Sequence, residues 1–201
     1  MRKEEDIVQK KQKRDIEQTR AALLKAAKEL MTSCDDADKV TSRAIAARAE
    51  VNLAMINYCF GSREALLYEV FKQLLGDAQR AQPELAKALG ADIAPRERVV
   101  MLHFYMMKLM IANFSFSKAI TRYILLNRSG EMGMESLACI REHFGERKTE
   151  QECRLIAFEL SSLHELAVLR HEELKEEYGT DLSDDEALMK YVRESTQRFL
   201  D

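Results

Sequence analysis

The side chains best suited to metal or thiol chemistry are Cys139 and His143, which lie four residues apart. Residues at this spacing share one face of a helix, and Cys153 can join them as a third ligand. Zinc sites use four protein ligands, or three and an open position, and no clear fourth ligand follows. Buried free cysteines more often serve packing. We therefore predict no metal site and leave a redox role of these side chains open.

Catalytic arrangements are missing from the sequence. It contains no nucleophile paired with a base and no glycine-rich phosphate loop. We expect no enzyme and no cofactor. His164 and His171 are seven residues apart on one predicted helix face, which favours interface residues over metal ligands.

A band rich in methionine and aromatic residues follows Val100. Methionine adapts to irregular shapes, so such a band can line an apolar pocket. Ordinary core packing is the alternative explanation. The candidate pocket residues are His103, Tyr105, Met106, Met107, Met110, Phe114, Arg122 and Tyr123.

Two short helices with a tight turn between them form the clearest pattern. Thr41 or Ser42 can cap the first, because a hydroxyl accepts from the free N–H groups of an opening turn. Asn52 is a suitable cap for the second, which reaches about Cys59. Helices this short must pack on neighbours. Two of them at a steep angle form a helix-turn-helix, whose second helix fits a DNA major groove. The apolar positions of the first helix are Ile45, Ala46 and Ala49.

Composition and charge agree with a helical chain that has one DNA-facing end. Good helix formers dominate the 201 residues, and only two prolines interrupt them, which predicts an all-α fold. The net charge of −3 argues by itself against nucleic-acid binding. However, residues 1–80 hold 15 basic and 13 acidic residues, whereas the rest hold 16 and 21. This asymmetry favours a front that faces DNA.

The sequence also favours a cytoplasmic protein. No apolar run approaches the ~20 residues that span a bilayer. The four cysteines form no C-x-x-C pair and no signal peptide is evident, as is typical of reduced thiols inside a cell.

Further helices are predicted along the rest of the chain. Residues 1–14 are mostly charged and are expected to form an arm or a frayed helix start. Their basic cluster either reaches DNA phosphates or is simply solvated. Later helices are expected from Ser62 to about Gly76, between Pro83 and Gly90, at about 96–113, from a break at 115–117 to about Asn127, and at about 135–144.

Two capping boxes mark the last two helices. Thr149-x-x-Glu152 opens a long helix to about Tyr178, and Ser183-x-x-Glu186 opens a helix over 184–200. A short polar loop joins them, which predicts an antiparallel pair. The apolar stripe of the first comprises Leu155, Ile156, Leu160, Leu163, Leu166, Ala167 and Leu174.

Three motifs follow one another between Arg20 and Leu75. They read R-x-x-L-L-x-A-A-x-x-L-M, then T-x-R-x-I-A-x-x-A, then V-N-x-x-x-I-N-Y-x-F-G-S-R-E-x-L-L. In order and spacing this stretch resembles the DNA-binding domain of the TetR-like (tetracycline-repressor) family of bacterial regulators. It covers just over a quarter of the chain.

The resemblance implies a homodimer on a near-palindromic DNA operator. It divides the chain into an arm (1–14), a helix-turn-helix domain (15–62), a connecting helix (63–76) and an effector-binding and dimerisation domain (77–201). The last two long helices, about 149–178 and 184–200, would form the dimer interface. A small-molecule effector in the pocket would swing the two DNA-binding heads apart.

The resemblance also implies a set of DNA contacts. Thr41 and Ser42 would meet a phosphate. Arg43 would read a guanine, with a phosphate contact as the alternative. Leu53 and Ala54 would pack on thymine methyls, and Asn57 would bond an adenine or a phosphate. The complete set is Thr41, Ser42, Arg43, Asn52, Leu53, Ala54, Asn57, Tyr58 and Arg63, of which Tyr58 and Arg63 would hold phosphates.

The sequence as a whole predicts a DNA-binding transcriptional regulator, in particular a repressor released by an effector. The alternative is a helical protein–protein adaptor that keeps the DNA-binding fold without ligand control. A tightly packed region over residues 95–170 would favour the adaptor.

Overall fold

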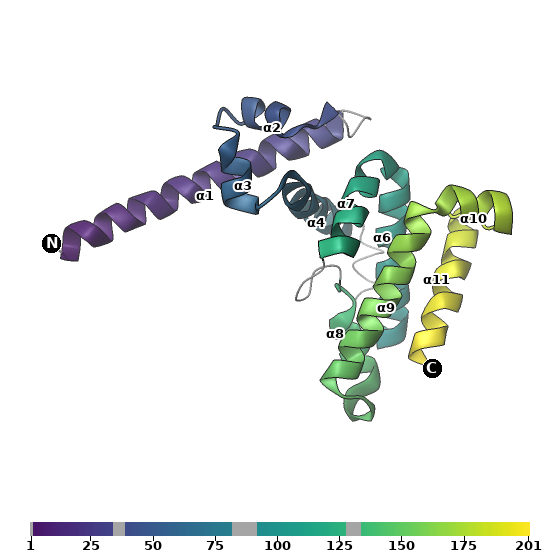
Figure 1. The fold of residues 1–201 in the computed structure, drawn as a ribbon. Coiled ribbons are helices and arrows are strands. Elements are labelled where there is room, and N and C mark those ends of the chain that lie inside the picture. Colours follow the sequence, from purple (N-terminus) through teal and green to yellow (C-terminus); the bar gives the residue numbers. More distant parts are fainter. Residues whose placement is uncertain (1, 34–38, 82–91, 128–133) are drawn as a thin grey trace. The chain divides into compact units, whose positions relative to one another are not determined.

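The structure is a computed structural model that describes residues 2–33, 39–81, 92–127 and 134–201 (Figure 1). All regular elements in these ranges are helices, which confirms the predicted all-α fold. The chain divides into two compact units, residues 1–74 and 75–201. The predicted helix between Pro83 and Gly90 falls outside the described residues.

Unit 1 contains α1 (Arg2–Ser33), α2 (Ser42–Arg48), α3 (Ala54–Phe60) and the start of α4 (Arg63–Ala81). Helix α1 contacts both α2 and α3. The buried side chains come from all four helices and are apolar, which is what allows two helices of seven residues to persist. They include Leu23, Ala27, Ile45, Ile56, Leu66 and Leu67.

Helix boundaries in unit 1 differ from the prediction at both ends. Helix α1 begins at Arg2, so residues 2–14 continue the helix. Helix α4 passes Gly76 and reaches Ala81, because a glycine weakens a helix without ending it. The predicted cap at Thr41 is confirmed, since Ala44 N donates to Thr41 Oγ1 at 3.1 Å. At the expected start of α4, Ala65 N donates to Ser62 Oγ at 3.0 Å.

The turn between α2 and α3 is a Schellman motif built on a glutamate. Val51 N donates to Ala46 O at 3.0 Å, and Glu50 N donates to Ala47 O at 3.2 Å. This pattern requires a left-handed residue after the helix. Glu50 fills it with φ of 56°, where glycine is the usual choice.

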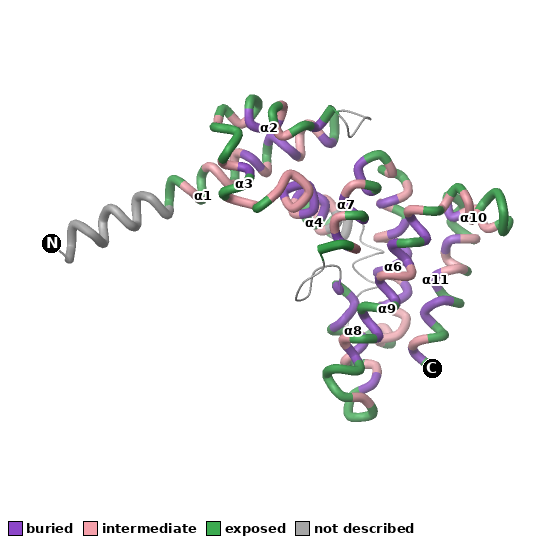
Figure 2. Tube along the Cα trace, in the orientation of Figure 1, coloured by how far each residue is buried: buried purple, intermediate pink, exposed green. Residues whose placement is uncertain are grey.

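Unit 2 is a bundle centred on α6 (Pro95–Ala112), which contacts α7, α8, α9 and α11. These helices are α7 (Phe114–Asn127), α8 (Leu137–Phe144), α9 (Glu150–Leu169), α10 (His171–Tyr178) and α11 (Asp185–Leu200), with a short 3-10 turn at Gly145–Arg147. Their inward faces are buried along α6, α9 and α11 (Figure 2).

Polar side chains are distributed unequally between the two cores. Nine polar or charged residues are buried among those whose burial is described, and all lie in unit 2. They are His103, Ser117, Thr121, Ser136, Ser161, His164, Glu165, Ser195 and Thr196.

The predicted long helix over 149–178 is wrong, because it breaks at Arg170. The backbone there has φ −115° and ψ 24°, and α10 starts anew at His171. The break places the His171 ring against Phe114, with ring centroids 4.4 Å apart. The break before α7 lies at Asn113 instead of 115–117.

The two predicted capping boxes have different outcomes. Thr149 and Glu152 form the predicted reciprocal pair at the start of α9. At α11 the cap is Asp184, whose Oδ1 accepts from Ala187 N at 2.9 Å. Ser183 lies one residue too early because its own N–H donates to Asp181 Oδ1.

The predicted stripe of α9 also needs correction. Leu160 is buried, but Leu155 and Leu166 are 55% and 47% exposed, and Phe158 is 47% exposed. These three residues lie on a second, outward face of α9.

None of the helices in the described part of the chain has both the length and the apolar character that spanning a membrane requires.

Candidate nucleic-acid interface

The first predicted DNA-contacting element is the start of α2. Thr41 and Arg43 are exposed, and Ser42 is half-buried. The Thr41 oxygen already accepts from the backbone, so its hydroxyl hydrogen remains to donate outward. The opening of α2 therefore presents a hydroxyl donor next to a guanidinium.

Helix α3 carries the second group. Ile56 is 1% exposed and fixes the inner face, while Leu53 and Tyr58 are 44% and 65% exposed. Ala54 and Asn57 are exposed on the same outer surface. These exposed positions are the ones to which the DNA contacts were assigned. Val51 and Phe60 are half-buried.

Asn52 caps α3 in a way that uses part of its side chain. Its Oδ1 accepts from Ala54 N at 2.8 Å, so the helix proper begins at Ala54. The amide nitrogen of Asn52 is its remaining polar group for an outside partner.

Arg63 lies at the start of α4, and part of its guanidinium binds within unit 1. Its Nε donates to Val40 O at 2.7 Å, directly before α2. Its side chain is only 22% exposed. Arg63 thus ties α4 to the segment that leads into α2.

Arg20 on α1 was not among the predicted site residues. Its Nη1 donates to Cys59 O at 2.7 Å. Its guanidinium carbon lies 4.1 Å from the centroid of the Phe60 ring. A sequence separation of 39 residues gives no local signal for such a contact, although Arg20 opens the first of the three motifs.

In unit 2, His103 lies in a buried hydrogen-bonded chain. Its Nε2 is 3.0 Å from Ser136 Oγ, and its Nδ1 is 2.7 Å from His164 Nδ1. His164 Nε2 is 2.7 Å from Ser195 Oγ. The chain joins α6 and the residue before α8 to α9 and α11. His164 is 2% exposed inside unit 2, so its predicted place in an interface is wrong.

The donors assign a direction to this chain. The Ser195 hydroxyl donates to Tyr191 O at 2.7 Å, so Ser195 Oγ accepts from His164 Nε2–H. His164 Nδ1 then accepts from His103 Nδ1–H, and His103 Nε2 accepts from the Ser136 hydroxyl. Every group has a partner only while both imidazoles are neutral.

Burial agrees with neutral rings. Loss of solvation lowers the pKa of His103 to about 4. The same effect, with a smaller contribution from His103, lowers the pKa of His164 well below its usual value of 6.5.

The other candidate pocket residues are dispersed in burial. Met107 and Met110 are buried, Tyr105, Met106, Phe114 and Tyr123 are half-buried, and Arg122 is exposed. A surface groove of about 640 Å³ lies elsewhere, between α6 and α11. Its lining comes from α11 and from one residue of the aromatic band on α6, and comprises Phe104, Asp185, Glu186, Met189, Lys190, Arg193 and Glu194.

Cys139 and Cys153 have the features of packing residues. Cys153 is buried in the core cluster, and Cys139 packs against that cluster. Burial raises the pKa of both thiols, which disfavours the reactive thiolate. In the described part of the chain, no group of three or more His, Cys, Asp or Glu side chains could hold a metal ion.

Comparison with known families agrees with the geometry of unit 1. Residues 23–70 match the family model of bacterial regulatory proteins of the tetR family. These residues form a TetR-family DNA-binding domain. The predicted resemblance is confirmed, and the protein is a DNA-binding transcriptional regulator rather than an enzyme. No curated protein is significantly similar to the chain.

The TetR-family match includes α2 and α3 together with the second part of α1 and the first part of α4. It covers every predicted DNA contact from Thr41 to Arg63 and ends within α4. Arg20 lies three residues before the matched range.

Proposed function

We propose that the protein is a homodimeric repressor that binds a near-palindromic operator and leaves it when a small molecule binds unit 2. The main observation behind this proposal is the outer surface of α2 and α3, which supports the DNA-binding part of it. Arg43, Asn57 and Tyr58 are exposed there over a buried Ile56. This surface therefore combines a guanidinium, an amide and an aromatic hydroxyl. Groups of these kinds bind base edges and phosphates.

The proposed DNA contact of each residue follows from the chemistry of its side chain. Arg43 reads a guanine edge, because a guanidinium can donate to two acceptors at once. Asn57 bonds an adenine edge or a phosphate, and Leu53 and Ala54 pack on thymine methyls. Thr41, Ser42, the Asn52 amide, Tyr58 and Arg63 hold the sugar–phosphate backbone. The Nε contact of Arg63 with Val40 O holds its guanidinium next to the start of α2, and its Nη1 pairs with Glu64 at 3.4 Å.

The exposed face of α9 supports a homodimer. Leu155, Phe158 and Leu166 lie within one side of this helix and are each about half exposed. Apolar side chains gathered in this way mark an association surface. In the proposed dimer this face packs against its copy, with α11 alongside, and so sets the spacing of the two α3 helices.

Release by an effector is a shift in population between two dimer arrangements. The proposed pocket lies among the candidate residues of α6 and α7. His103 already has protein partners on both ring nitrogens, so an effector that bonds it must displace one of them. This observation argues against an effector that bonds His103 itself and leaves the other candidate residues of α6 and α7 as the proposed contacts.

Selection of bound duplexes from a random pool tests the function, with and without a metabolite extract. We expect a near-palindromic sequence to be enriched and its enrichment to fall with the active extract. Its affinity should drop steeply with salt, since phosphate contacts release counterions. Affinity that stays flat between 50 and 200 mM salt, as rough working concentrations, would contradict the proposal. Enrichment that no extract changes would favour the adaptor.

We place the protein in the cytoplasm, where it meets DNA.

A further inference from the structure

The end of the recognition helix α3 leaves backbone carbonyls that need partners. The last four C=O groups of any helix lack an intrahelical donor. Gly61 N satisfies Asn57 O at 2.9 Å, with Gly61 in the left-handed region at φ 80°. Cys59 O lies two residues farther along the helix and receives its hydrogen bond from Arg20.

Arg20 makes two different contacts at this end. It donates to Cys59 O at 2.7 Å and stacks over Phe60 at 4.1 Å. A cation near the C-terminus of a helix also interacts favourably with the helix dipole. A planar guanidinium can stack and donate at the same time, whereas an ammonium group has no plane to stack. Both contacts act on the last two residues of α3.

Helix α3 depends on such outside contacts. It has seven residues, fewer than the roughly 12–15 that an isolated helix needs. Ile56 anchors its middle and the Asn52 side chain its start. Arg20 is the contact that fixes the end, one residue beyond Tyr58.

We propose that Arg20 is a positioning residue for DNA recognition, which holds α3 at the angle where Asn57 and Tyr58 meet the major groove. This inference rests on DNA binding through α3 as set out above. Arg20 acts through Cys59 and Phe60, and its half-buried guanidinium is committed to them instead of to a phosphate.

The test compares Arg20→Met with Lys25→Met in the full chain. Lys25 is an exposed residue of α1, so its variant loses the same charge without these contacts. The probes are a duplex enriched by the wild-type protein and a shuffled duplex of equal composition. For Arg20→Met we expect operator affinity to fall on the order of tenfold, shuffled-duplex affinity to stay the same, and the salt slope to be unchanged.

Amide hydrogen exchange provides a second readout that needs no DNA. In Arg20→Met the amides of α3 should exchange on the order of tenfold faster, whereas those of α2 and α4 should not. Arg20→Lys should recover part of the loss. Phe60→Leu removes the ring but keeps apolar volume, and should reduce the operator-to-shuffled ratio in the same way even if Arg20→Met does not fold.

Two results would overturn the inference. Equal loss on both duplexes, with a salt slope reduced by roughly 0.9, would make Arg20 a phosphate contact. Unchanged discrimination with unchanged exchange in α3 would show that its contacts do not position the helix. Failure of the wild-type protein to bind any duplex would instead contradict the proposed function, and the exchange result would still decide whether Arg20 fixes α3.

Discussion

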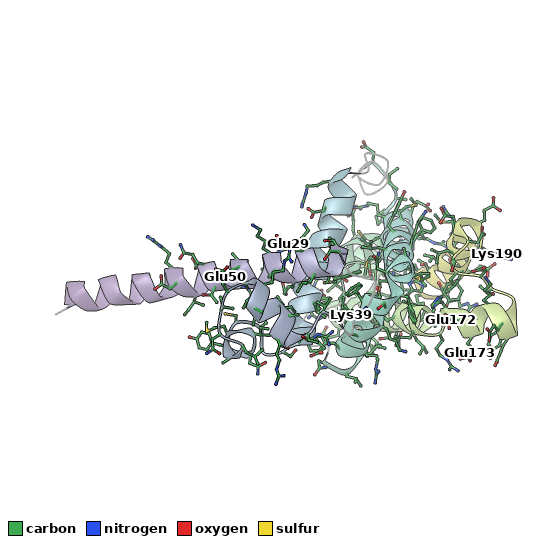
Figure 3. All side chains as sticks on the ribbon, turned by 90° about the horizontal axis from the view of Figure 1, so that it is seen from above. Glu29, Lys39, Glu50, Glu172, Glu173 and Lys190 are labelled. Carbon is green, nitrogen blue, oxygen red and sulfur yellow. The ribbon has the colours of Figure 1, made fainter. Side chains whose placement is uncertain are left out.

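Glu50 shows how one residue can carry strain at the centre of a functional motif. A side chain at φ 56° costs about 1–2 kcal/mol relative to a right-handed conformation. The position separates α2 from α3, and its side chain is exposed (Figure 3). The conformation is therefore required by the turn, while the glutamate side chain is not.

Glu50→Gly should raise the free energy of unfolding by about 0.5–1 kcal/mol, because glycine reaches this φ without steric cost. The higher conformational entropy of glycine in the unfolded chain offsets part of this stabilisation. Urea denaturation followed by circular dichroism measures this change. Glu50→Ala keeps a Cβ atom and is the matched control, with no comparable gain. A glycine variant no more stable than the alanine variant would show that Glu50 is not strained.

Arg43→Ala should lower operator affinity by about 1–3 kcal/mol and relax sequence preference at one base pair. Arg48→Ala is the control on the same helix, because Arg48 pairs with Glu29 at 2.8 Å. This variant should still discriminate between the operator and a shuffled duplex. Competition between operator and shuffled duplexes separates the two. Equal weakening on both duplexes would assign Arg43 to a phosphate, and dissociation into monomers would contradict its assigned role.

At the scale of elements, the fold depends on caps and breaks more than on helix propensity. Two caps have the same sequence signature, yet only Thr149 acts as its pattern predicts. At α11, the preceding turn engages the Ser183 N–H through Asp181 and shifts the cap to Asp184. A local motif therefore predicts a helix start only to within a residue.

Asp184→Ala should cost about 1 kcal/mol of stability, because the N–H of Ala187 loses its acceptor. Ser183→Ala should change stability by only a few tenths of a kcal/mol, since the Ser183 side chain does not cap α11. Thermal unfolding of both variants measures the difference. The opposite ranking would place the cap at Ser183 after all.

The sequence predicted the short helices α2 and α3 of unit 1 well because each has a local signal, a cap or an apolar spacing, whereas Gly76 did not end α4. It also predicted which side chains of α3 face outward. It could not predict Arg20 or the His103–His164 pair, because their partners lie 39 and 61 residues away. It grouped Leu155 with Leu160 because apolar character alone does not say which face of α9 meets the core.

At the scale of the whole molecule, the outward face of α9 should control assembly. Phe158→Asp should weaken the dimer on the order of ten- to a hundredfold, because a twofold interface contains each side chain twice. Phe158 is 47% exposed, so each copy contributes about half of the roughly 1.5–3 kcal/mol of a fully buried phenylalanine. Sedimentation velocity over a concentration series measures this. Leu126→Asp changes another exposed residue, 81% accessible on α7, and should leave the dimer intact. Equal behaviour of the two variants would exclude the α9 face.

Stability should depend on pH through the two buried histidines. Their folded-state pKa values lie below 6.5, so the unfolded chain binds protons that the folded chain does not. Stability is therefore fully present above pH 6.5 and is lost as pH falls toward 4, by up to about 1.4 kcal/mol per pH unit for each histidine. Urea midpoints between pH 7.5 and 5 should show this loss, with a shallower slope for His164→Gln. A flat wild-type profile would contradict it.

The unequal placement of buried polar residues also bears on how the two units can change over generations. An apolar core accepts exchanges among leucine, isoleucine and methionine one position at a time. A directed chain of hydrogen bonds does not, because replacing His103 alone leaves His164 without its donor. Descendants of this sequence should therefore drift freely inside unit 1, while positions 103 and 164 are replaced together or kept.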